Sequence, residues 1–126
     1  MKNYRTPLAR ARGLGSAREG LHDWWRQRVT AVALVPLGLW FAFSVALLPS
    51  ASHAELVAWI NVPWNTLLLL SFILIAFYHT MLGLQVVIED YVHLDWLKLV
   101  GILGVKLVVS FLTLAAVYAI LRIVFT

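Results

Sequence analysis

The chain has 126 residues, of which 62% are hydrophobic and 13% charged, and its net charge is +4. A soluble domain of this size could not hide so much apolar surface, because small domains leave a large share of their area in water, so most of the chain must lie in lipid. The absence of cysteine excludes disulfides, zinc–thiolate sites and iron–sulfur ligation by this chain alone.

Residues 1–28 form a basic arm that carries seven of the ten lysines and arginines. Positive charge ahead of a first apolar run is typical of topology signals and of attraction to anionic lipid, so the charge does not indicate a nucleic-acid partner. A signal peptide is the alternative for the run that follows. We reject it because the run is longer than about 7–15 residues and its basic lead-in is too long.

Three apolar runs follow the arm, at residues 29–48, 64–88 and 99–125. Each satisfies the requirement of about 20 residues to cross about 30 Å of hydrocarbon as a helix. The sequence therefore predicts an all-α integral membrane protein with three transmembrane helices at about these positions. In domain terms, the arm at 1–28 precedes one transmembrane domain at 29–126.

The basic residues also predict the orientation. The loop at 49–63 contains no lysine or arginine, whereas the arm contains seven. By the positive-inside rule the N-terminus lies in the cytoplasm and the C-terminus in the periplasm, and the second loop, at 89–98, returns to the cytoplasmic side.

His79 lies near the middle of the second predicted helix. An ionisable side chain at that depth is costly and needs a partner. One interpretation is a neutral imidazole that is hydrogen-bonded to a neighbouring helix. The other is an axial ligand of haem iron, which binds a neutral imidazole nitrogen in an apolar pocket.

The other three histidines, His22, His53 and His93, all fall at or beyond the predicted membrane surface. His79 therefore has no partner of matching depth in its own chain. A haem with two histidine ligands would need its second ligand from another polypeptide. The three helices would then form half of a haem-binding bundle that a partner subunit completes.

A helical stripe leads from His79 to the cytoplasmic end of the second helix. Gly83 follows one turn on, where a flat macrocycle or a close helix contact would need room, and Asp90 falls eleven residues on, within about 20° of the same direction. Tyr91 comes next. These two residues are typical of an ordinary interface, but they could also bind a quinone, with Tyr91 donating to a carbonyl and Asp90 orienting it or handling protons.

Arg28 opens the first apolar run at the cytoplasmic edge. Positive charge is expected there for topology alone. The position also suits an ion pair with an anionic group, such as a haem propionate.

Taken together, these short motifs resemble the small hydrophobic D-type anchor subunit of succinate dehydrogenase, in its alphaproteobacterial form. The resemblance covers the chain from about residue 20 onward. The motifs that carry it are Gly20-Leu21-His22-Asp23, Arg28-x-Thr30-Ala31, His79-x-x-x-Gly83-x-Gln85 and Asp90-Tyr91.

The resemblance implies a multi-pass subunit of the bacterial inner membrane that is not itself the site of succinate oxidation. It implies haem b shared with a C-type cytochrome b anchor subunit, with His79 as axial ligand and Arg28 near the propionates. It implies ubiquinone near Tyr91 and Asp90, and a flavoprotein and an iron–sulfur subunit on the cytoplasmic face. A fumarate reductase anchor and a non-redox assembly or transport subunit remain as alternatives.

Overall fold

The computed structural model describes residue 7 and residues 17–126, so the lysine and arginines at positions 2, 5, 10 and 12 of the basic arm lie outside the described residues. Its helices are α2 (Ala17–Ala46), α3 (His53–Asn61), α4 (Pro63–Tyr91) and α5 (Asp95–Val124). Of these, α2, α4 and α5 contain spans long and apolar enough to cross a membrane. The predicted all-α architecture with three spans is confirmed.

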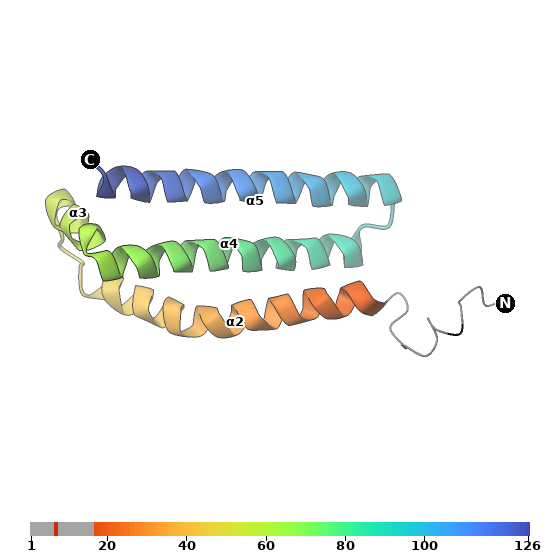
Figure 1. Ribbon diagram of the computed structural model, residues 1–126. Coiled ribbons are helices and arrows are strands. Elements are labelled where there is room, and N and C mark those ends of the chain that lie inside the picture. The colour runs from red at the N-terminus through yellow and green to blue at the C-terminus, as the bar shows by residue number, and fades with distance from the viewer. Residues whose placement is uncertain (1–6, 8–16) are drawn as a thin grey trace.

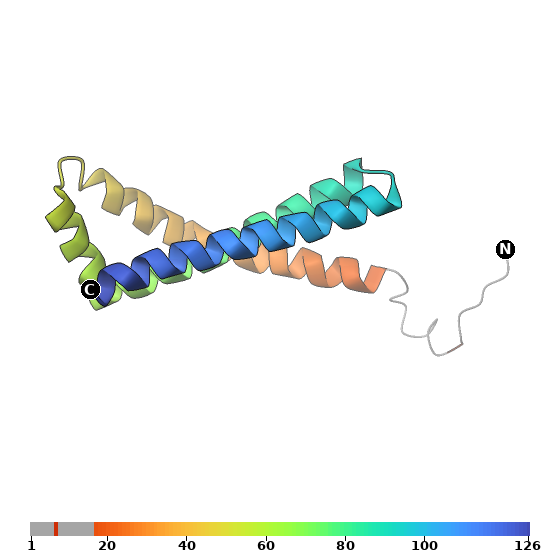
Figure 2. The same cartoon turned by 90° about the horizontal axis from the view of Figure 1, so that it is seen from above.

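The three long helices lie side by side in a row, with α4 between α2 and α5 (Figure 1). Within the described residues, α4 packs against both neighbours, whereas α2 and α5 make no contact with each other. Seen from above, α5 runs along α4 and α2 crosses both at an angle (Figure 2). The start of α2 and the turn between α4 and α5 lie at one end, and α3 and the C-terminus lie at the other (Figure 1).

The helices begin earlier than the apolar runs. The first starts at Ala17 instead of residue 29, so the last twelve residues of the predicted arm are helical, and α5 starts at Asp95 instead of residue 99. The reason is physical: hydropathy reports the length of chain in hydrocarbon, whereas a helix continues into the interface as long as its backbone hydrogen bonds do. The start of α4 is sharper, because Pro63 occupies its first turn, where no N–H is needed.

The loop predicted at 49–63 contains a helix that the hydropathy reading missed. Helix α3 begins after Ser52, whose hydroxyl accepts from the Glu55 N–H while the Glu55 carboxylate accepts from the Ser52 N–H. This reciprocal capping box is visible in the sequence as Ser-x-x-Glu. Trp59 of α3 stacks on Trp40 of α2, with ring centroids 5.6 Å apart, and so fixes α3 against the end of the row.

The chain buries few side chains by itself. Among the described residues the buried hydrophobic side chains are Leu69 and Leu82 of α4 and Val109 and Ile120 of α5. Phe41 of α2 stacks on Phe72 of α4 at 5.0 Å. A flat row of helices leaves most apolar surface for lipid or for other membrane subunits to cover.

Candidate functional site

His79 lies near the middle of α4 and faces α2. Its Nδ1 is 2.8 Å from the hydroxyl oxygen of Thr30, and both side chains are half-buried. In hydrocarbon the groups of a neighbouring helix take the place of water as hydrogen-bond partners. The expected partner on a neighbouring helix is therefore present.

Gln27 stands on the other side of the imidazole. Its Nε2 is 3.5 Å from the Nε2 of His79, at the long limit of a hydrogen bond. Its Oε1 is buried and has no hydrogen-bond partner within the described part of the chain. Gly83, one turn along α4, lies beside this amide, and a Cβ there would be at an ordinary contact distance of 3.6 Å from the Gln27 nitrogen.

Thr30 and Gln27 are functional candidates that residue-type reasoning did not single out. They lie three residues apart on α2 and therefore share one face of the helix. A signal was present in the sequence: Thr30 is a hydroxyl near the start of an apolar run, and such hydroxyls hydrogen-bond across membrane helices. The sequence did not show that its partner is His79.

Arg28 lies on a different part of the α2 surface, about 100° around the helix from Gln27. Its side chain is exposed, and its guanidinium carbon lies over the ring of Trp24, 5.5 Å from the centroid. The structure does not bring Arg28 to the imidazole of His79. Its proposed ionic partner would approach from outside the chain.

Asp90 and Tyr91 lie at the end of α4, both exposed, and the side chain of Tyr91 is 77% accessible. Along the stripe from His79 toward the end of α4 the side chains change from buried to exposed, since Leu82 is 5% accessible and Val86 is 43% accessible. Asp90 and Tyr91 therefore do not join His79 in one pocket. They present a carboxylate and a phenol beside the turn between α4 and α5.

The remaining histidines lie far from the middle of the row. His22 is on the first part of α2, His53 is the first residue of α3, and His93 lies in the turn after α4. Within residue 7 and residues 17–126, no three His, Asp or Glu side chains gather as a metal-ion site. A metal at His79 would therefore need ligands from outside the described chain, as haem iron does with its four macrocycle nitrogens.

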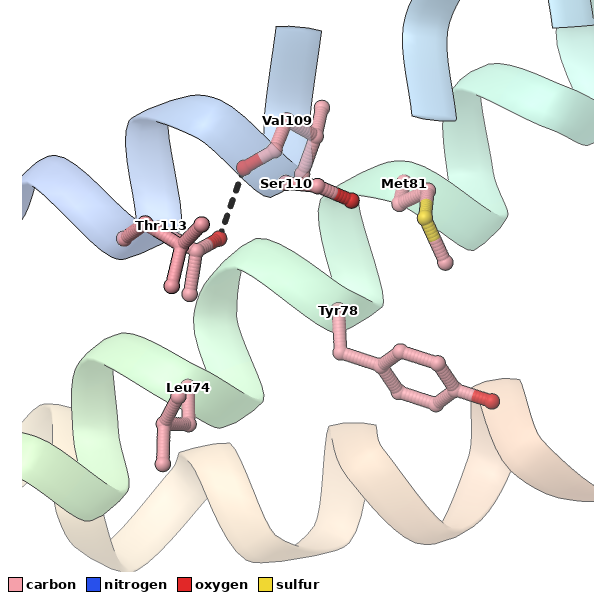
Figure 3. Close-up of a pocket in the computed structure, with 7 residues that line it drawn as sticks. Leu74, Tyr78, Met81, Val109, Ser110 and Thr113 are labelled. Carbon is pink, nitrogen blue, oxygen red and sulfur yellow. Dashed lines mark hydrogen bonds between the residues drawn. The ribbon is translucent and has the colours of Figure 1, made fainter. Parts of the chain in front are cut away.

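A groove of about 420 Å³ lies between α4 and α5 (Figure 3). It is lined mainly by apolar side chains, with Tyr78 on α4 and Ser110 and Thr113 on α5. The hydroxyl of Thr113 donates to the Val109 carbonyl and so is already satisfied. Neither His79 nor Thr30 lines this groove, and its described lining residues include no second strong ligand.

Comparison with known proteins connects these features to one family. Residues 2–119 match the family model described as succinate dehydrogenase/fumarate reductase transmembrane subunit. No solved structure matches the chain.

Individual relatives agree with that match. The chain is 38% identical over 115 residues to the succinate dehydrogenase hydrophobic membrane anchor subunit of Rickettsia bellii, covering 90% of each chain. It is 36% identical over 88 residues to the protein of the same name from Paracoccus denitrificans, covering 70% of this chain and 68% of the relative. A Rickettsia conorii anchor subunit is 32% identical over 106 residues, covering 83% of this chain and 84% of the relative.

Proposed function

The chain belongs to the family of succinate dehydrogenase/fumarate reductase transmembrane subunits, and we propose that within such a complex His79 is an axial ligand of haem b. The chain is a multi-pass hydrophobic anchor of the bacterial inner membrane, and it associates with the soluble catalytic subunits of its complex. The haem, the quinone and the roles of single residues are proposals that rest on the site.

The observation that supports haem ligation is the pairing of His79 with Thr30. A ligating histidine normally hydrogen-bonds through its other ring nitrogen, which fixes the orientation of the ring. The Nδ1 of His79 is held in this way at 2.8 Å, while its Nε2 has only the 3.5 Å contact with Gln27. The side chains fit an axial imidazole, since Nε2 has no short hydrogen bond and the buried Gln27 oxygen has no partner among the described residues, so this side of the ring is incompletely bonded.

When bound, haem supplies one-electron redox chemistry, and this chain would provide orientation and an apolar surrounding. The second axial ligand would come from a C-type cytochrome b anchor subunit, because His22, His53 and His93 lie at the ends of the helices. The open row of helices agrees with a bundle that a second membrane subunit completes. Arg28, exposed and backed by Trp24, would pair with a haem propionate.

The quinone site would lie at the end of α4. Tyr91 would donate its phenol hydrogen to a carbonyl of ubiquinone, and Asp90 would orient the ring or handle protons. By the positive-inside rule, the basic arm would place this end of the row in the cytoplasm. Electrons from a flavoprotein and an iron–sulfur subunit on that face would then reach the quinone near Tyr91.

The test is the replacement His79→Ala in the complete complex, with His53→Ala as the control at the opposite end. Complexes purified in mild detergent are compared by haem-to-flavin ratio and by the reduced-minus-oxidised absorption spectrum. We expect His79→Ala to lose or alter the spectrum of a haem with two histidine ligands, whereas His53→Ala retains it. An unchanged spectrum in His79→Ala would show that the imidazole has only the structural hydrogen bond to Thr30.

The family description covers transmembrane subunits of both succinate dehydrogenase and fumarate reductase, so a fumarate reductase anchor is the alternative. The named relatives favour succinate oxidation. Comparing succinate oxidation with fumarate reduction by the purified complex, using quinones of different potential, decides the direction.

A further inference from the structure

We propose that Thr30 is a positioning residue, whose hydroxyl accepts the Nδ1 hydrogen of His79 and thereby reserves Nε2 for iron. The inference rests on the proposed ligation of haem by His79. The proposed role of Thr30 adds a residue of α2 to a site that would otherwise consist of a single side chain on α4.

The single hydrogen of the Thr30 hydroxyl limits how the bond to His79 can be directed. The Thr30 oxygen is 2.7 Å from the carbonyl oxygen of Arg26 and 3.0 Å from that of Gln27, as well as 2.8 Å from Nδ1 of His79. A hydroxyl has one hydrogen and two acceptor lone pairs, and carbonyl oxygens can only accept. When the single hydrogen goes to the preceding turn of the helix, as is common for threonine, the oxygen must accept from His79.

Gln27 agrees with the same form of the ring from the other side. Its amide nitrogen can only donate, so a hydrogen bond across the 3.5 Å to the Nε2 of His79 needs that ring nitrogen as the acceptor. A neutral imidazole has one hydrogen, and a bare Nε2 requires that hydrogen on Nδ1. Thr30 and Gln27 thus favour one tautomer, and it is the tautomer that leaves Nε2 free to bind a metal.

The two contacts differ in how easily they are exchanged. The contact with Thr30 is short and anchored to the backbone of α2, whereas the contact with Gln27 is at the limit of hydrogen bonding and comes from a flexible side chain. The lone pair of Nε2 can serve only one partner, so iron would replace Gln27 and leave Thr30 in place. Donation from Nδ1 also raises the basicity of the ligand, which favours ferric over ferrous iron.

The experiment replaces Thr30 by valine, which is nearly the same size but cannot accept a hydrogen bond. We expect the Thr30→Val complex to retain haem about 10–100-fold less tightly, the usual effect of losing such an outer partner. The remaining haem should show shifted electron paramagnetic resonance signals in its ferric state. Its ferric/ferrous midpoint potential should become more positive. Thr30→Ser should restore all three, because it restores the hydroxyl.

The control is Thr113→Val, since Thr113 is also half-buried but bonds only to its own helix, and we expect it to leave the haem unchanged. Haem is counted per flavin, so a lower yield of complex does not affect the result. If the Thr30→Val complex does not assemble, Thr30→Ala is used instead. If the Thr30→Val complex retains haem as tightly as the wild type, with the same resonance signals and the same midpoint potential, the proposed role of Thr30 is overturned. If His79→Ala also keeps its haem spectrum, the proposed ligation itself fails, and the two failures are thereby distinguished.

Discussion

Replacing Tyr91 by phenylalanine isolates the chemistry of its hydroxyl from the fold. Tyr91 is 77% accessible and is the last residue of α4, so the ring can stay in place when the oxygen is removed. Stability should therefore not change. Any loss of activity would come from a partner or substrate that the phenol contacts outside this chain.

The size of the effect follows from one hydrogen bond. A neutral hydrogen bond contributes about 0.5–1.5 kcal/mol net, and about 1.4 kcal/mol corresponds to a factor of ten, so kcat/KM for quinone should fall roughly 2- to 12-fold. A larger loss would require that the phenol also transfers a proton, which phenylalanine cannot do.

The assay compares two electron acceptors in the purified complex. Succinate oxidation is measured with a short-chain ubiquinone and, separately, with a soluble artificial acceptor that takes electrons before the membrane subunit. We expect Tyr91→Phe to lower only the first rate. Tyr118→Phe is the matched control, because Tyr118 is also exposed, at 64%, but lies on the last part of α5, toward the other end of the row.

Two results would refute the reasoning. An equal loss with both acceptors would mean that the substitution disturbs the complex as a whole. An equal loss in Tyr91→Phe and Tyr118→Phe with quinone would mean that an exposed phenol anywhere on the surface has this effect.

Two further predictions concern the packing of α2 against α4 and the cap of α3. Gly83→Ala should keep haem, because its Cβ would meet the Gln27 nitrogen at an ordinary contact distance of 3.6 Å. Gly83→Leu should lose haem, because the larger side chain would push α2 away from α4 at a cost of about 1–3 kcal/mol. The haem-to-flavin ratio checks both, and haem retained in the leucine variant would contradict the close packing. Ser52→Ala should destabilise α3 locally by about 1 kcal/mol through loss of its cap on Glu55, seen as faster amide hydrogen exchange within α3. Ser50→Ala, in the turn before α3, should leave that exchange unchanged, and equal rates in the two variants would argue against the cap.

The open row of helices explains why the site residues fall into separate groups. Thr30 and His79 meet where α2 and α4 pack, while Arg28, Asp90 and Tyr91 are exposed. Exposed polar groups on apolar helices are suited to contact other subunits or a ligand held between subunits. The division agrees with a chain that supplies half of a larger membrane assembly.

The sequence determined the number of spans and singled out His79. Lipid requires about 20 apolar residues for each crossing, and such runs are readable without any tertiary contact. An ionisable side chain inside such a run is equally conspicuous, because it has to be satisfied by something other than water. The capping box of α3 was also present in the sequence, but hydropathy does not report it.

Only the tertiary structure decided which faces of the helices meet. In a soluble helix the apolar stripe reveals the buried face, but in a membrane helix the surfaces that face lipid and those that face protein are both apolar. The sequence therefore could not tell which helix satisfies His79, although Thr30 was in view as part of a motif. The packing of α2 against α4 made that choice, and with it which ring nitrogen of His79 meets Thr30.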